Sequence, residues 1–248
     1  ISQIGYMFIA VGLEFYNGAM FHIFTHAFFK GCLFLCAGII IHKMDGEQDI
    51  YKMGGLYKKM PIVYIVSWIA VLALCGIPPL SGFYSKEAIL GQALTTGGTI
   101  SIVVYLLGAV TAFLTAFYCF KLLILVFHGN KRYEHYHNHK SFTMTISVIV
   151  LAILAAIAGI YYNNFIGDNS KQFWGNIIIH NIVSEEHNLI LGYLPVILSI
   201  VGIFSAYIIY FKRYGTANNI VTTFSLTYKF LVNKWYFDKI YDKIFVNN

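Results

Sequence analysis

Two histidines and a lysine recur at intervals of four residues in the segment FHIFTHAFFK, as His22, His26 and Lys30. Four residues advance an α-helix by about 400°, so each group lies about 40° around the helix from the last and about 6 Å further along. On a helix, the three side chains form one polar stripe. A histidine can take up a proton at one ring nitrogen and release it from the other near neutral pH, which favours proton transfer. Hydrogen bonds need about 3 Å, so we expect Thr25 or waters to bridge the gaps.

A second lysine, Lys86, follows the proline-rich sequence GIPPLSG and has Glu87 beside it. A lysine charge deep in hydrocarbon costs about 3 kcal/mol or more, so a lysine inside a membrane is a candidate functional group. We expect Lys86 to gain and lose a proton, with Glu87 as a secondary participant. The alternative is a fixed ion pair with Glu87 or an ammonium that reaches the surface. Lys121 lies about two turns before the end of its apolar run, so its side chain either reaches the interface, which we favour, or serves as a proton exit.

Membrane-spanning helices must position these groups, because 58% of the residues are hydrophobic and only 11% are charged, against about 25% in soluble domains. Four long runs contain no Asp, Glu, Lys or Arg: 60–85, 88–120, 141–167 and 187–211. Each exceeds the roughly 20 residues that cross a bilayer as a helix. Soluble helices need polar faces and outer-membrane strands alternate in polarity, so both alternatives are disfavoured. The sequence predicts an all-α polytopic membrane protein.

The apolar pattern predicts helices over 1–13, 18–42, 60–94, 99–128, 141–163 and 189–212. Five of them are complete, and the first opens partway through an apolar stretch, so we expect a fragment of a longer chain. The third would be about 52 Å long if straight, too long for one crossing. Pro78 and Pro79 remove backbone donors within it, which predicts a broken helix with halves at about 61–75 and 83–94. Unwound backbone at that depth must be buried or line a wet cavity.

Basic residues in the connections indicate the orientation. If every helix crosses once, one side carries thirteen Lys and Arg residues and the other carries Lys171 alone. This asymmetry places 43–59, 129–140 and the C-terminal tail in the cytoplasm or matrix. We expect a transmembrane domain over 1–212 and an interfacial tail over 213–248.

Other chemistry has little support in the sequence. Four histidines lie in or beside one short basic loop: His128, His135, His137 and His139. That loop has no cysteine ligands, and the pair His22 and His26 has no third ligand nearby, so we expect no metal site. Four cysteines lie in apolar runs without a CxxC motif: Cys32, Cys36, Cys75 and Cys119. The sequence contains no nucleotide-binding loop and no set of ligands for a flavin, haem or iron–sulfur cluster, and we expect no nucleic-acid partner.

Five segments together resemble the antiporter-like subunits of respiratory NADH:quinone oxidoreductase, complex I, and within that family most closely its distal member. They are ISQIGYM, FHIFTHAFFKGCLFLCAG, DIYKMGGLYKKMP, GIPPLSGFYSKEAIL and NKWYFDKIYD. The resemblance implies two inverted repeats, each with a broken helix, of which this chain begins in the second; a lateral helix would follow residue 248. It also implies that Lys86 is the broken-helix lysine that loads a proton, and that His22, His26 and Lys30 belong to the central hydrophilic axis.

The implied function is proton translocation driven by NADH oxidation and quinone reduction in other subunits. FMN, iron–sulfur clusters and quinone would then be bound outside this chain, which would carry no redox residues. Expected partners are other membrane-arm subunits, above all a neighbouring antiporter-like subunit, together with lipid and protons. We expect a bacterial plasma membrane rather than a mitochondrial inner membrane. Two alternatives remain: the large subunit of a multisubunit cation (Na⁺)/proton antiporter, and a purely structural scaffold.

Overall fold

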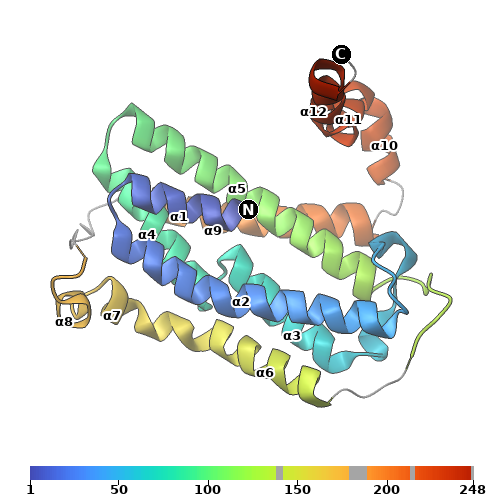
Figure 1. Ribbon diagram of the computed structural model, residues 1–248, viewed down its shortest axis with the longest axis horizontal. Helices are drawn as coiled ribbons and strands as arrows, with labels where there is room; N and C mark the ends of the chain where they lie inside the picture. The colour runs from blue at the N-terminus through green and yellow to red at the C-terminus, as the bar shows by residue number, and fades with distance from the viewer. Residues whose placement is uncertain (138–141, 179–188, 213–215, 247–248) are drawn as a thin grey trace. The chain divides into compact units, whose positions relative to one another are not determined.

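The computed structural model describes residues 1–137, 142–178, 189–212 and 216–246, and these contain helices and no strands (Figure 1). Two parts of the predicted connections, His139 with its neighbours and residues 179–187, lie outside the described residues. The chain divides into a unit over Ile1–Tyr207 and a unit over Ile208–Asn248. The predicted partition at residue 212 remains a prediction.

The first unit consists of long apolar helices joined by short helical turns. Its helices are α1 (Ser2–Gly12), α2 (Tyr16–Lys43), α3 (Pro61–Cys75), α4 (Ser81–Thr96), α5 (Thr99–Phe127), α6 (Phe142–Ile157), α7 (Tyr162–Phe165), α8 (Ser170–Trp174) and α9 (Leu189–Tyr207). Figure 1 shows α1 and α2 as an antiparallel hairpin, and α2 packs against α3, α4 and α6 while α5 packs along α9.

Four segments are long and apolar enough to cross a membrane: Tyr16–Lys43, Thr99–Phe127, Phe142–Phe165 and Leu191–Lys212. Their outward faces carry large apolar side chains; on α5, for example, Leu107 is 62% exposed and Leu114 is 53% exposed. Such faces suit hydrocarbon and not water. The prediction of an all-helical membrane protein is therefore confirmed.

The predicted broken helix is present as α3 and α4, which follow one another along α2. The α3 helix ends because Gly76 adopts a left-handed conformation, with φ of 73°. The backbone N–H groups of Gly76 and Ile77 then bond back to the carbonyls of Ala73 and Leu72, which closes a Schellman motif. The start of α4 packs tightly on this end, since a Cβ at Gly82 would lie 1.9 Å from the carbonyl oxygen of Ala73.

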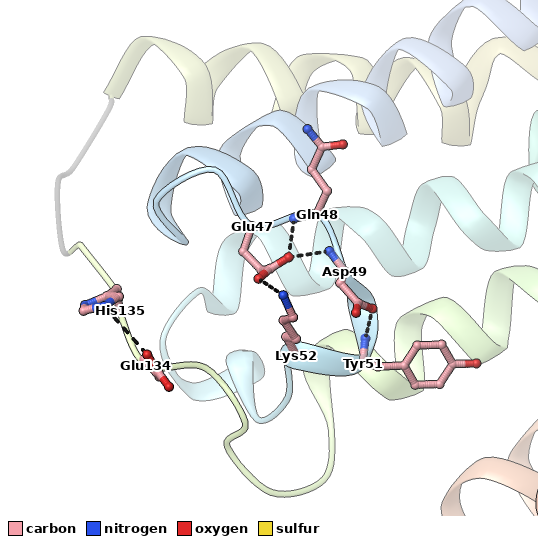
Figure 2. Close-up of polar contacts among 7 residues, drawn as sticks. All are labelled: Glu47, Gln48, Asp49, Tyr51, Lys52, Glu134 and His135. Carbon is pink, nitrogen blue, oxygen red and sulfur yellow. Dashed lines mark hydrogen bonds and ion pairs between the residues drawn. The ribbon is translucent and has the colours of Figure 1, made fainter.

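The connection between α2 and α3 is ordered by its own polar groups, as Figure 2 shows. The Glu47 carboxylate accepts bonds from the backbone N–H groups of Gln48 and Asp49, at 3.0 and 2.9 Å, and lies 3.1 Å from the Lys52 ammonium. The Asp49 N–H and the Lys52 charge lower the pKa of Glu47, and Glu47 raises the pKa of Lys52. The Asp49 side chain in turn accepts the N–H of Tyr51 at 2.9 Å.

Arg132 links this connection to the end of α5 through hydrogen bonds. Its guanidinium donates to the carbonyl oxygens of Tyr51, at 2.8 Å, and of Leu125, at 2.7 Å. The backbone N–H of Gly55 also bonds to the carbonyl of His128, at 3.1 Å. The loop that contains the KMGGL sequence is therefore fixed to the end of α5 that precedes the basic loop.

The second unit consists of short helices: α10 (Thr216–Thr223), α11 (Ser225–Val232) and α12 (Phe237–Tyr241). Most of its described side chains are exposed, and they include large apolar residues such as Leu226, at 85%, and Phe237, at 69%. The predicted interfacial location of this tail remains a prediction.

Candidate functional site

Lys86 is the one lysine that is buried in the described part of the chain, with 5% of its surface exposed. Its ammonium donates a hydrogen bond of 2.6 Å to the carbonyl oxygen of Leu74. Leu74 lies in the last turn of α3, where carbonyls without a partner in the regular helix carry partial negative charge. The lysine belongs to the second half-helix but places its charge at the end of the first, so this end of α3 stabilises the ammonium.

The aromatic ring of Tyr6, on α1, lies over the same ammonium. The Lys86 nitrogen lies 5.1 Å from the centre of the Tyr6 ring, within the range of a cation–π interaction. The Tyr6 hydroxyl donates to the carbonyl of Gly108 on α5, at 2.6 Å. The buried lysine thus contacts α1 and α3, and neither of its two partners is a carboxylate.

His22 contacts the broken helix at Ser85, the residue that precedes Lys86. Its Nδ1 lies 2.9 Å from the Ser85 hydroxyl, and Thr25 donates to the same hydroxyl at 3.0 Å. All three side chains are fully buried. The His22 Nε2 has no hydrogen-bond partner among the described protein atoms. Two hydroxyl groups therefore connect the histidine helix to α4.

The predicted polar stripe on α2 has the expected spacing and runs from a buried to a half-buried position. The ring centres of His22 and His26 are 6.1 Å apart. His26 and Lys30 are partly exposed, and the Lys30 ammonium lies over the ring of Phe34 at 5.2 Å. The Thr25 hydroxyl hydrogen-bonds to Ser85 on α4 and to the carbonyl of His22, so it does not bridge the side chains of the stripe.

The two secondary candidates lie in different places. Glu87 is half-buried and lines a small cavity of about 20 Å³ together with Lys86, Gly192 and Pro195, which is room for one water molecule. Lys121 instead places its ammonium 5.4 Å from the ring of Tyr51, in the connection after α2. That position matches the interfacial alternative for Lys121.

Three partners of the site were not expected from the sequence: Tyr6, Ser85 and the carbonyl of Leu74. Ser85 had a visible signal, because it is a polar residue next to Lys86. A fourth unexpected group, the Ser199 hydroxyl of α9, donates to the carbonyl of Cys75 at 3.0 Å and so caps the break as well.

A lysine is buried at a break between two half-helices, next to a helix with a histidine stripe, and buried ionisable groups at such breaks are typical of ion-translocating membrane proteins. Residues 1–115 match the family described as NADH:quinone oxidoreductase/Mrp antiporter, transmembrane. The chain is 38% identical over 260 residues to NADH-ubiquinone oxidoreductase chain 5 of Acanthamoeba castellanii, which covers 100% of this chain and 38% of the relative. It is 41% identical over 252 residues to the chain 5 protein of Phytophthora infestans, with coverages of 97% and 38%.

A bacterial relative gives the same result. NADH-quinone oxidoreductase subunit L of Rickettsia felis is 36% identical over 274 residues, which cover 99% of this chain and 40% of the relative. The chain spans about two fifths of the length of these relatives. Residues 1–115 thus match the antiporter-like family, and the whole chain is similar to part of chain 5 and subunit L. The resemblance inferred from the sequence motifs is thereby confirmed.

Proposed function

We propose that this chain is a segment of the proton-translocating L-type subunit of NADH:quinone oxidoreductase. The observation that carries the proposal is the Lys86 ammonium, which is buried at the break and supported by the carbonyl of Leu74. A group in this position changes its charge by exchanging a proton. The carbonyl dipole and the aromatic ring beside it stabilise the charged form against the cost of burial, and a conformational change can withdraw them. These properties suit a proton carrier with controlled access.

The proposed path uses groups that the fold brings within reach of one another. His26 and Lys30 lie at the more exposed part of the α2 stripe, His22 lies at its buried part, and Ser85 connects His22 to α4. Ring centres 6.1 Å apart require a water or a rotating side chain between the two histidines. The Ser85 hydroxyl can both accept and donate a hydrogen bond, so it can pass on a proton that His22 releases.

The driving reaction takes place in other subunits under this proposal. Electrons would pass from NADH through FMN and iron–sulfur clusters to quinone, and changes of charge in a neighbouring antiporter-like subunit would alter the proton affinity of Lys86. Glu87, half-buried and next to Lys86 in the sequence, is the candidate to relay such a change. Lys121 reaches the interface under this proposal, and a role as a proton exit is the alternative.

Inverted repeats and a lateral helix outside this segment belong to the same proposal, as does a location in the bacterial plasma membrane. The relatives come from bacteria and from eukaryotes, so both a bacterial and a mitochondrial inner membrane fit their names. The cation/proton antiporter alternative is not favoured, because these relatives are named as subunits of NADH oxidoreductases.

The proposed function is tested in inverted membrane vesicles from a strain that carries the full-length gene and from a strain that lacks it. We expect NADH to drive proton uptake in sodium-free buffer only with the gene present, and an uncoupler to abolish it. Proton release that requires a sodium gradient and proceeds without NADH would contradict the proposal and support the antiporter.

A further inference from the structure

We propose that Tyr6 is a positioning residue for Lys86, whose ring holds the lysine charge at the end of α3 and controls its exchange with His22. This inference rests on the proposed function, since it assigns the control of the same proton site. Tyr6 lies on the buried face of α1 with 1% of its surface exposed, and its two buried neighbours on that helix are Gln3 and Ala10.

The ring lies at the junction of the two groups that the proposed path must connect. Its centre is 5.1 Å from the Lys86 nitrogen and 6.0 Å from the centre of the His22 ring. Proton transfer needs heavy atoms about 3 Å apart, so the position of this ring bears on how Lys86 approaches the His22 side of the site. The tyrosine therefore borders both groups at once.

The position of the ring is fixed at its far end. The hydroxyl donates to the carbonyl of Gly108, at 2.6 Å. The ring also packs closely on this part of α5, since a Cβ at residue 108 would lie 3.5 Å from it, in van der Waals contact. Since α5 provides this anchor, a shift of α5 against α1 would move the ring relative to Lys86.

The Tyr6 ring can stabilise the lysine charge but cannot accept its proton. The face of an aromatic ring attracts a cation through its quadrupole but has no lone pair that accepts a proton. The carbonyl of Leu74 likewise accepts a hydrogen bond without taking the proton. In this arrangement both partners stabilise charged Lys86, and the lysine discharges only when it leaves them.

The experiment weakens the ring's attraction while keeping its shape. Phenylalanine and phenylalanines with one, two or three fluorine atoms are introduced at residue 6 of the full-length protein, in assembled complex in inverted vesicles. Protons taken up per NADH oxidised are measured. Tyr6→Phe keeps the ring face but removes the bond to Gly108, so it is the reference against which the fluorinated rings are compared. Each added fluorine withdraws negative charge from the ring face. We therefore expect the number of protons taken up per NADH to fall at each step. Across the series, the equilibrium between lysine held at the ring and lysine released from it should change by up to about tenfold.

Tyr105 provides the matched control. It is 2% exposed, lies on α5, and donates its hydroxyl to the carbonyl of Leu191. The same fluorinated series at Tyr105 should leave the ratio unchanged. A flat ratio across the series at Tyr6, or equal falls at both positions, would overturn the inference.

Lys86→Ala serves as the reference that separates the two proposals. If this variant pumps normally in assembled complex, the proposed function fails. If it loses pumping while the fluorinated series at Tyr6 stays flat, only the role of Tyr6 fails.

Discussion

The ammonium of Lys86 lies 2.6 Å from the carbonyl oxygen of Leu74, although the two residues belong to different halves of the broken helix. This bond completes the end of α3, where every one of the last four carbonyls has a donor. The donors, in order along α3, are the N–H of Ile77, the N–H of Gly76, the Lys86 ammonium and the Ser199 hydroxyl. Lys86 is therefore a cap of the first half-helix as well as a candidate proton carrier. Loss of the lysine charge weakens this cap, so the protonation state of Lys86 is coupled to the geometry of the break.

Gly82→Ala should disrupt the break. The new Cβ would lie 1.9 Å from the backbone oxygen of Ala73, and a backbone atom cannot move aside as a side chain can. Overpacking of this kind costs about 1–3 kcal/mol or more. We expect little assembled complex on a native gel. Gly38→Ala is the control, because a Cβ there meets nothing within 4 Å. Equal assembly of the two variants would contradict the described packing.

Ser85→Ala should slow proton uptake by about tenfold, because it removes the hydroxyl that both His22 and Thr25 contact and leaves buried polar groups unpaired, at about 1–3 kcal/mol. Ser85→Thr keeps the hydroxyl and should restore most of the rate. Ser101→Ala, at another buried serine, is the control. The rate is measured as NADH-driven proton uptake in inverted vesicles. If the alanine variant at residue 85 behaves like the one at residue 101, His22 does not act through Ser85.

Arg132→Ala should release the connection between α2 and α3. It removes the bonds to the carbonyls of Tyr51 and Leu125, and Arg132→Lys cannot replace two divergent donors with one ammonium. Limited proteolysis of the assembled complex should then cut within residues 44–60 several times faster in both variants. Lys131→Ala, an exposed neighbour, provides the comparison. Unchanged cleavage in the Arg132 variants would show that other contacts hold this loop.

The docking of the same connection should weaken in acid through His128. Burial lowers the pKa of this histidine, whose Nε2 lies 3.1 Å from the Tyr64 hydroxyl and whose ring stacks on Tyr57. Because the released loop binds the proton more readily, docking is fully present above pH of about 6.5 and is lost as the pH falls toward the lowered value. Hydrogen exchange of residues 55–64, corrected for intrinsic rates, measures this loss. His128→Gln should remove the pH dependence, and an identical profile in that variant would assign the effect to another group.

The sequence was sufficient for the helices and for the broken segment, because charge-free runs and the paired prolines act locally. The stripe of His22 and His26 followed from helical periodicity in the same way. The direction of the Lys86 side chain could not be predicted. The sequence places the residue at the start of α4, whereas its hydrogen-bond partner is a backbone oxygen on α3, and no sequence pattern indicates a backbone partner. Tyr6 was hidden for a related reason: its role depends on how α1 packs against α4 and α5, and a tyrosine in an apolar run gives no signal of that.

The most direct measurement is NADH-driven proton uptake by inverted vesicles that carry the full-length protein with Lys86→Ala, with assembly checked on a native gel. Lys58→Ala, in the connection before α3, is the control for the loss of a positive charge. We predict a marked fall in protons taken up per NADH oxidised for Lys86→Ala in fully assembled complex, and no fall for Lys58→Ala. Normal uptake in assembled Lys86→Ala complex would contradict this prediction and leave this segment as a scaffold.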